Sequence, residues 1–123
     1  MKLRIRGNSI RLRLLRGEVA QFGATGAVTE TINFGASRMI YALRASGAVS
    51  EVSVNFTDNE IIIVIPNALA RDWVESNEVG FEAEQKVSAE ETLKILVEKD
   101  FICLDRPDDA DNQDAYPHQS VNC

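Results

Sequence analysis

Basic residues alternate along the start of the chain in a pattern that could hold an anion. They are Lys2, Arg4, Arg6, Arg11 and Arg13. Gly7-Asn8 lies between them, and both residues suit the tight turn of a β-hairpin. The alternation is that of β-strands, so the sequence predicts a two-stranded hairpin with all five cations on one face. We call these five residues the basic ladder, and it predicts a site for phosphates or another polyanion.

A plain structural role competes with this interpretation. A row of cations also forms an ordinary solvated outer face when acids on neighbouring strands pair with it. The candidates for such pairing are Glu82, Glu84 and Glu98. The chain is acidic overall and no aromatic residues interleave the ladder, so nucleic acid is an unlikely partner. The expected partner is an anionic small molecule or a protein.

A second charged motif, Glu82-x-Glu84-x-Lys86, places three charges on one face of a later strand. This spacing resembles the motif of the triphosphate tunnel phosphohydrolases, which are barrels built from duplicated units. The resemblance implies that Glu82 and Glu84 bind Mg²⁺ or Mn²⁺. It also implies that Lys86 and the basic ladder hold the triphosphate. Without that resemblance, no cofactor is expected, because no nucleophile motif or metal-ligand spacing is present.

Size and composition indicate one globular domain. The chain has 123 residues, a net charge of −6 and 45% hydrophobic residues. Eight of the 13 lysines and arginines, but only two of the 19 acids, fall within residues 1–50. No apolar run approaches the roughly 20 residues of a membrane helix, and the first residues do not form a signal peptide. We therefore expect a cytoplasmic protein without a membrane partner.

The chain resembles itself when it is shifted by 51 positions. Residues 52–85 then align with residues 1–34 without a gap, and the agreement lies in physical role rather than identity. The turn Gly7-Asn8 aligns with Asp58-Asn59, and Phe22 aligns with Trp73. An internal repeat of this kind predicts two copies of one structural unit. The basic ladder is not repeated; its counterparts are Ser53, Asn55, Thr57, Ile62 and Val64.

Hydrophobic periodicity supplies the elements of each unit. Strands are predicted over 1–6, 10–14, 27–34, 38–44, 52–57, 61–65, 79–87 and 93–104, with short helices over 15–26 and 66–77. The fold class is therefore α+β: duplicated ββαββ units that form a highly curved antiparallel sheet or an eight-stranded barrel with two short helices. The strand Ile61–Ile65 is apolar on both faces, which predicts a layer on each side of it.

The domain is expected to span residues 1–104, with repeats of about 1–50 and 51–104. Residues 105–123 are rich in aspartate and poor in apolar residues, which predicts a disordered or loosely docked acidic tail. Because the ordered part contains no catalytic constellation, a non-enzymatic binding or interaction domain is the first functional hypothesis. A metal-dependent phosphohydrolase of the tunnel type is the alternative.

The whole chain is also similar to a small family of bacterial proteins of unknown function. The resemblance rests on two stretches, Met1–Leu14 and Leu96–Phe101. It extends over nearly all of the chain and implies no activity.

Overall fold

The computed structural model describes residues 1–101, 114 and 116. Within these residues, ten elements follow one another in the order ββαββββαββ. The first half contains β1 (Lys2–Arg6), β2 (Ser9–Leu14), α1 (Arg16–Thr25), β3 (Ala27–Asn33) and β4 (Arg38–Ser46). The second half contains β5 (Ser53–Thr57), β6 (Glu60–Pro66), α2 (Asn67–Glu75), β7 (Gly80–Lys86) and β8 (Thr92–Lys99). The predicted α+β class and the order of the elements are confirmed.

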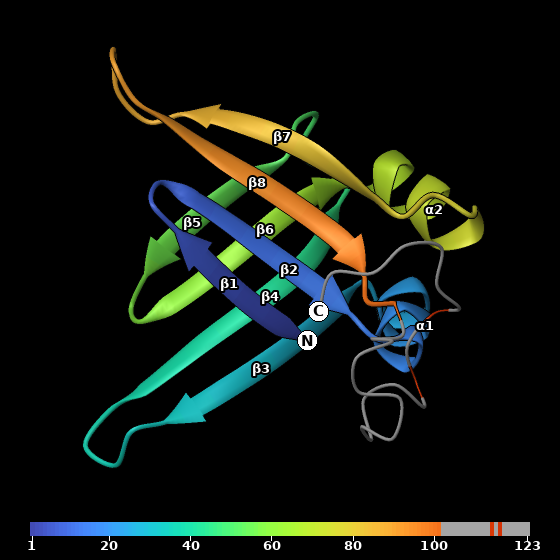
Figure 1. Cartoon of the computed structure of the whole chain (residues 1–123), viewed down its shortest axis with the longest axis horizontal. Coiled ribbons are helices and arrows are strands. Elements are labelled where there is room, and N and C mark those ends of the chain that lie inside the picture. Colours follow the sequence, from blue (N-terminus) through green and yellow to red (C-terminus); the bar gives the residue numbers. More distant parts are fainter. Residues whose placement is uncertain (102–113, 115, 117–123) are drawn as a thin grey trace.

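The strands form two four-stranded sheets that face one another (Figure 1). Sheet A has the order β1-β2-β8-β7, and sheet B has the order β3-β4-β6-β5. Each sheet therefore takes one hairpin from each half of the chain. The two central pairs, β2 with β8 and β4 with β6, are parallel, whereas the outer pairs are antiparallel. The prediction of a single antiparallel sheet or a closed barrel is wrong.

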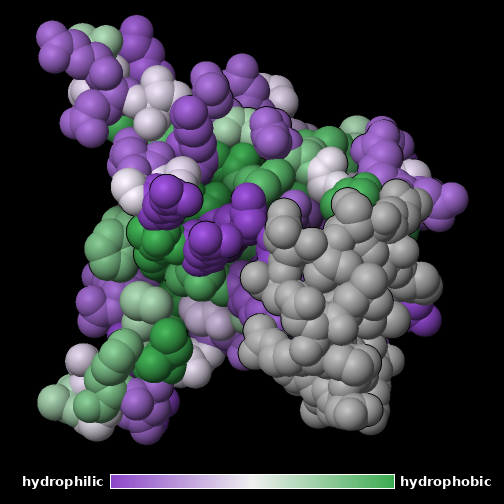
Figure 2. Space-filling view, viewed as in Figure 1, coloured by the Kyte–Doolittle hydropathy of each residue, from purple (hydrophilic) through white to green (hydrophobic). Residues whose placement is uncertain are grey.

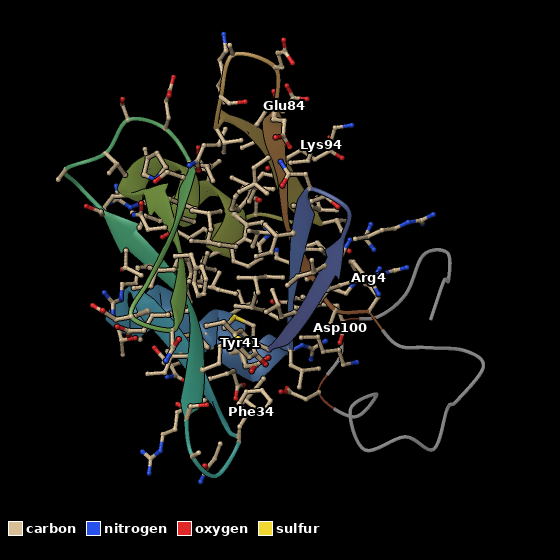
Figure 3. The ribbon with its side chains drawn as sticks, turned by 90° about the vertical axis from the view of Figure 1, so that its left-hand side faces the viewer. Arg4, Phe34, Tyr41, Glu84, Lys94 and Asp100 are labelled. Atoms are coloured by element: carbon tan, nitrogen blue, oxygen red, sulfur yellow. The ribbon has the colours of Figure 1, made fainter. Side chains whose placement is uncertain are left out.

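The two sheets do not join into a closed barrel. Where their edges meet, side-chain hydrogen bonds connect them in place of a backbone ladder. At the seam between β5 and β7, the Gln85 amide accepts a hydrogen bond from Val54 N (2.6 Å) and donates one to Val54 O (3.2 Å). At the seam between β1 and β3, the Met1 ammonium donates to Glu18 and to Glu30 (2.9 Å). The Tyr41 hydroxyl donates to Met1 O (2.8 Å). Figure 3 shows the two sheets edge-on, with side chains between them.

The core lies between the sheets and is closed by both helices at one end. Phe22 of α1 and Trp73 of α2 pack edge to face with ring centroids 6.1 Å apart, and both are almost completely buried. Inward-facing aliphatic residues complete this core: Leu12, Leu14, Leu43, Ile63, Ile65, Ile95 and Val97. The four hairpin turns lie at the end of the sandwich away from the helices (Figure 1). Backbone hydrogen bonds confirm that the two turns of each sheet are neighbours: Lys94 N donates to Asn8 O in sheet A, and Ile40 N donates to Asn59 O in sheet B.

Strand β6 is covered on one face only. Its inward residues Ile63 and Ile65 are buried, but the outward Ile62 and Val64 are half-buried. The helices sit at the end of the sandwich rather than on sheet B, so no layer covers the outer face within the described residues (Figure 1). The expectation of a layer on each side is wrong. Only cross-strand neighbours flank these two residues on the outer face, namely Ala42, Arg44, Ser53 and Asn55.

The first helix is capped by Glu18 of its own first turn and by Asp114, near the other end of the chain. Leu15 offers no polar side chain, but Glu18 accepts from Leu15 N at 2.8 Å. The backbone oxygen of Asp114 accepts from Arg16 N at 2.8 Å, and its carboxylate accepts from Gly17 N at 3.2 Å. Asp114 thus accepts hydrogen bonds from N–H groups of the first helical turn that have no acceptor within the helix. Apart from Asp114 and Tyr116, the predicted acidic tail lies outside the described residues.

The buried ammonium of Met1 is expected to make the protein less stable at alkaline pH. Burial lowers the pKa of this amine, but hydrogen bonds and charges of Glu18 and Glu30 outweigh burial and raise the pKa above its ordinary 8.0. A raised pKa contributes stability that is complete below 8.0 and is lost as the pH climbs through the higher folded value. With this amine free, we expect the melting temperature to fall as the pH rises above 8.0.

Glu18→Gln combined with Glu30→Gln should flatten that part of the curve, since the amide side chains retain acceptors but not charge. The matched control is Glu90→Gln with Glu91→Gln, both exposed in the β7–β8 turn. Thermal unfolding across this pH range distinguishes the variants. Parallel curves for all three proteins would contradict the assignment.

Candidate functional site

The outer face of sheet A collects charged side chains in rows that run across the four strands. The register gives three rows, from β1 to β7. They are Arg6–Ser9–Lys94–Glu84, Arg4–Arg11–Leu96–Glu82 and Lys2–Arg13–Glu98–Gly80. Basic residues therefore occupy one side of the face and acidic residues the other. Figure 2 looks onto this face and shows hydrophilic side chains gathered over β1 and β2.

The basic ladder is confirmed as one face of a hairpin. Its five residues all point away from sheet B, as Figure 3 shows for Arg4. The hairpin forms because Leu3 and Ile10 alternate with the cations and face the interior, which fixes the register. Gly7 occupies the turn with a φ of +54°, a left-handed value that glycine adopts without strain.

The cations of the third row, Lys2 and Arg13, are each paired with an acid. Arg13 Nε lies 2.7 Å from Glu98 Oε1, and Arg11 Nε lies 3.5 Å from the same oxygen. Lys2 Nζ lies 3.0 Å from the largely buried Asp100. Of the three acids expected to pair with the ladder, Glu98 does so. Glu82 and Glu84 have no basic group within 4 Å among the described residues.

Arg4 and Arg6 are left without an acid. Neither has a carboxylate within 4 Å in the part of the chain that the structure describes, and both are exposed. Arg4 also lies directly opposite Arg11 in the β1–β2 register. Like charges placed opposite one another on a sheet repel, so this pair leaves a concentrated positive charge beside β2.

A groove of about 620 Å³ runs over β2, β8 and β7 next to these arginines. Arg11 and Lys94 supply positive charge, Glu82 and Glu84 supply negative charge, and Leu96 provides an apolar floor between them. Figure 3 shows Glu84 and Lys94 on this outer side of sheet A. The groove lies on an outer face rather than inside a barrel, so the tunnel geometry implied by the resemblance does not occur.

The structure brings together most of the residues predicted from the sequence. Arg11, Glu82 and Glu84 line one groove, and Arg4 and Arg6 lie beside it. Lys86 is more distant: it is opposite Thr92 at the end of β7, near the hairpin turn. Ser9, Lys94 and Leu96 were not predicted, because only the parallel pairing of β2 with β8 places them there.

The described residues offer a metal ion few ligands. They contain no cluster of three or more His, Cys, Asp or Glu side chains with the geometry of a metal site. Two carboxylates remain, Glu82 and Glu84, and magnesium is commonly held by one or two carboxylates together with phosphate oxygens. These two residues therefore fit a metal only as part of a metal–phosphate complex.

Fold and face together define a small α+β protein: two mixed sheets, two helices closing one end, and a charged outer face bearing a shallow groove. No helix within the described residues has the length and apolar character needed to cross a bilayer. Residues 1–120 match the family of unknown function DUF7009, and the chain belongs to this family. No curated protein and no solved structure has significant similarity to it. The resemblance to a family of unknown function is thus confirmed.

Proposed function

We propose that this protein is a binding domain that holds a small phosphate-rich anion on the outer face of sheet A. The observation that carries the proposal is the concentration of positive charge at Arg4, Arg6 and Arg11. Two of these arginines face each other, and two have no carboxylate within 4 Å among the described residues. An anion with several oxygens would relieve their repulsion and accept paired hydrogen bonds from their guanidinium groups.

The adjoining groove supports a small ligand. Its volume of about 620 Å³ falls within the range of roughly 300–1,000 Å³ that is typical of ligand sites. Lys94 and Arg11 extend the positive charge from the ladder into the groove, and Leu96 offers a surface for an apolar group. An anion with an attached ring or chain would use both the ladder and this floor.

The fold itself does not require the ladder. The corresponding outward positions on β5 and β6 hold Ser53, Asn55, Thr57, Ile62 and Val64, and that hairpin forms the same type of antiparallel pair. Because uncharged residues satisfy the same geometry, the hairpin itself does not require cations, and Arg4 and Arg6 pair with no carboxylate within 4 Å among the described residues. This contrast favours a ligand over a merely solvated face.

We also propose that the two halves are copies of one ββαββ unit. In the shifted alignment β1, β2, β3 and β4 correspond to β5, β6, β7 and β8. Exchanging each strand for its counterpart turns the order of sheet A, β1-β2-β8-β7, into β5-β6-β4-β3, which is sheet B read from its other edge. Phe22 and Trp73, which correspond in the shifted alignment, meet at the contact between the helices. An experimental structure tests this by superposition of the halves. Helices that fail to coincide would contradict a duplication.

A metal-dependent triphosphate hydrolase is the alternative, favoured by one observation. Glu82 and Glu84 line the same groove as Arg11, so a metal held by the carboxylates would lie near a phosphate held by the arginine. A bound Mg²⁺ or Mn²⁺ would polarise the phosphoryl oxygens and offset their charge. The chain's own contribution would be to orient the phosphates through Arg11 and Lys94.

Isothermal titration with inorganic triphosphate, with and without Mg²⁺, tests the anion site. We expect Arg4→Gln combined with Arg6→Gln to weaken binding at least tenfold, because it removes the unpaired guanidinium groups. The control, Arg44→Gln with Arg71→Gln, changes the net charge equally on exposed residues elsewhere and should retain affinity. Equal loss in both variants, or loss in neither, would refute the site.

Glu82→Gln combined with Glu84→Gln separates the two functions. For a simple anion site, the change removes nearby negative charge and should strengthen triphosphate binding without metal. For a hydrolase, it should abolish Mg²⁺-dependent phosphate release and weaken binding in the presence of Mg²⁺. Absence of phosphate release by the unmodified protein over a panel of triphosphates would eliminate the hydrolase.

A further inference from the structure

The end of the sandwich opposite the helices exposes a group of large apolar side chains. Ile5, Phe34 and Phe56 are 62%, 63% and 66% exposed, and Ile32 and Val87 are also exposed. Together they come from all four hairpins. We call these five residues the apolar mouth. Hydrophobic side chains are visible at this end in Figure 2, on the left between the two projecting hairpins.

These residues continue the inward-facing rows of the core. Ile5 follows Leu3 at the two-residue spacing of a strand, and Phe56 follows Val54 in the same way. Both helices lie at the other end of the sandwich, so they do not cover these inward-facing residues near the turns (Figure 1). An apolar surface gathered at one end in this manner marks an interaction site rather than scattered surface hydrophobics.

The charges around the mouth are divided between its two sides. The strand orders and the two seams place the β1–β2 and β3–β4 hairpins next to each other, and the other two hairpins opposite them. The first pair carries Arg6 and Arg38 near its tips. The opposite pair carries mainly acids, namely Asp58, Glu60, Glu84, Glu90 and Glu91, with two added cations, Lys86 and Lys94.

We propose that the apolar mouth docks against the mouth of a second copy of this chain, forming a twofold symmetric dimer. Turning one copy about an axis that crosses the mouth from sheet A to sheet B brings its basic hairpins onto the acidic hairpins of the other. Arg38 of each copy then faces Asp58 of its partner. A symmetric interface presents the same patch twice, and this patch is complementary to itself only in that orientation.

The proposal commits to a second copy because both signs of charge border one apolar centre. A partner of uniformly one charge would meet repulsion on half of the rim, whereas a copy of the chain meets attraction on both halves. The groove on the outer face of sheet A remains accessible in this arrangement, since the contact is made at the end of the sandwich. Arg6 and Glu84 border both the mouth and the groove, so the dimer is tested through Phe56 and the Arg38–Asp58 pair, which lie outside the proposed anion site.

Sedimentation velocity over a range of protein concentrations tests the dimer. We expect Phe56→Asp to convert the dimer to a monomer by placing a charge in the apolar centre. The matched control is Val79→Asp, since Val79 is 41% exposed but lies between α2 and β7, away from the mouth. It should leave the dimer intact. Circular dichroism spectra of both variants confirm that they are folded.

A charge exchange then tests the orientation. Arg38→Asp alone should weaken the dimer at least tenfold, and adding Asp58→Lys in the same chain should restore most of the affinity. A monomeric unmodified protein at all concentrations would overturn the proposal, as would a dimer that survives Phe56→Asp. A monomer that binds fatty acids or other apolar small molecules through the mouth would likewise replace the second copy with a ligand.

Discussion

Replacing Trp73 with alanine is expected to cost about 4 kcal/mol of unfolding free energy, the range observed when a large buried aromatic residue is removed. The Trp73 side chain is fully buried where both helices meet the sandwich. Its ring makes edge contacts with Phe22 and with Phe81 at a centroid distance of 5.7 Å. The indole N–H donates to Val79 O at 3.1 Å. Removal therefore leaves a cavity at the junction and takes one of two donors from Val79 O, which keeps its hydrogen bond from Lys99 N.

Urea unfolding followed by far-ultraviolet circular dichroism measures this loss. Trp73→Phe is the matched variant: it keeps most of the aromatic volume but not the hydrogen bond, so its loss should be clearly smaller. A loss below about 1 kcal/mol for Trp73→Ala would place it among ordinary surface substitutions and contradict the packing of the two helices.

Alanine at Gly80 should be the second most damaging change, with a loss of about 3 kcal/mol, at the upper end for an overpacked site. Gly80 begins β7 and pairs with Glu98 of β8. A Cβ added there would overlap the carbonyl oxygen of Val97 and would lie 2.8 Å from Glu98 Cα. These are backbone atoms of a central strand, so they cannot move aside without breaking the β7–β8 pairing.

Gly47→Ala provides the control for that substitution. A Cβ at Gly47 would lie 3.1 Å from Asn67 Nδ2, the end of a flexible side chain that can rotate away. We expect its unfolding free energy to remain within about 0.5 kcal/mol of the parent protein. Thermal and urea unfolding of both variants give the comparison. Equal stability of the two would show that β7 does not approach β8 as closely as described.

Local patterns in the sequence were sufficient to predict the hairpins and helices. Alternation along residues 2–14 predicted the charged hairpin, and the matched positions of Phe22 and Trp73 predicted two helices with large buried anchors. These signals are local because each depends on side-chain spacing within one or two elements. The α+β class followed from them.

The pairing of distant strands could not be predicted in the same way. Nothing local to β2 or β8 specifies that they lie parallel and adjacent, yet this pairing splits the strands into two sheets and leaves the barrel open. It also brings Lys94 and Leu96 beside Arg11 to form the groove. The candidate charged residues were therefore recognisable from sequence, but their convergence was not.

The cap of α1 was hidden for a similar reason. Leu15 carries no capping group, and the acceptor that replaces one comes from Asp114, near the other end of the chain. The apolar mouth was missed because its residues alternate as core residues do. Only the three-dimensional arrangement shows that the helices cover one end of the sandwich and leave Ile5 and Phe56 exposed.

A titration with inorganic triphosphate, followed by nuclear magnetic resonance of the arginine Nε–Hε groups, is the most direct test of the anion site. We predict saturable shifts for Arg4, Arg6 and Arg11, while the signals of Arg44 and Arg71 stay unchanged. Shifts spread evenly over all arginines, or absent from Arg4 and Arg6, would contradict this prediction.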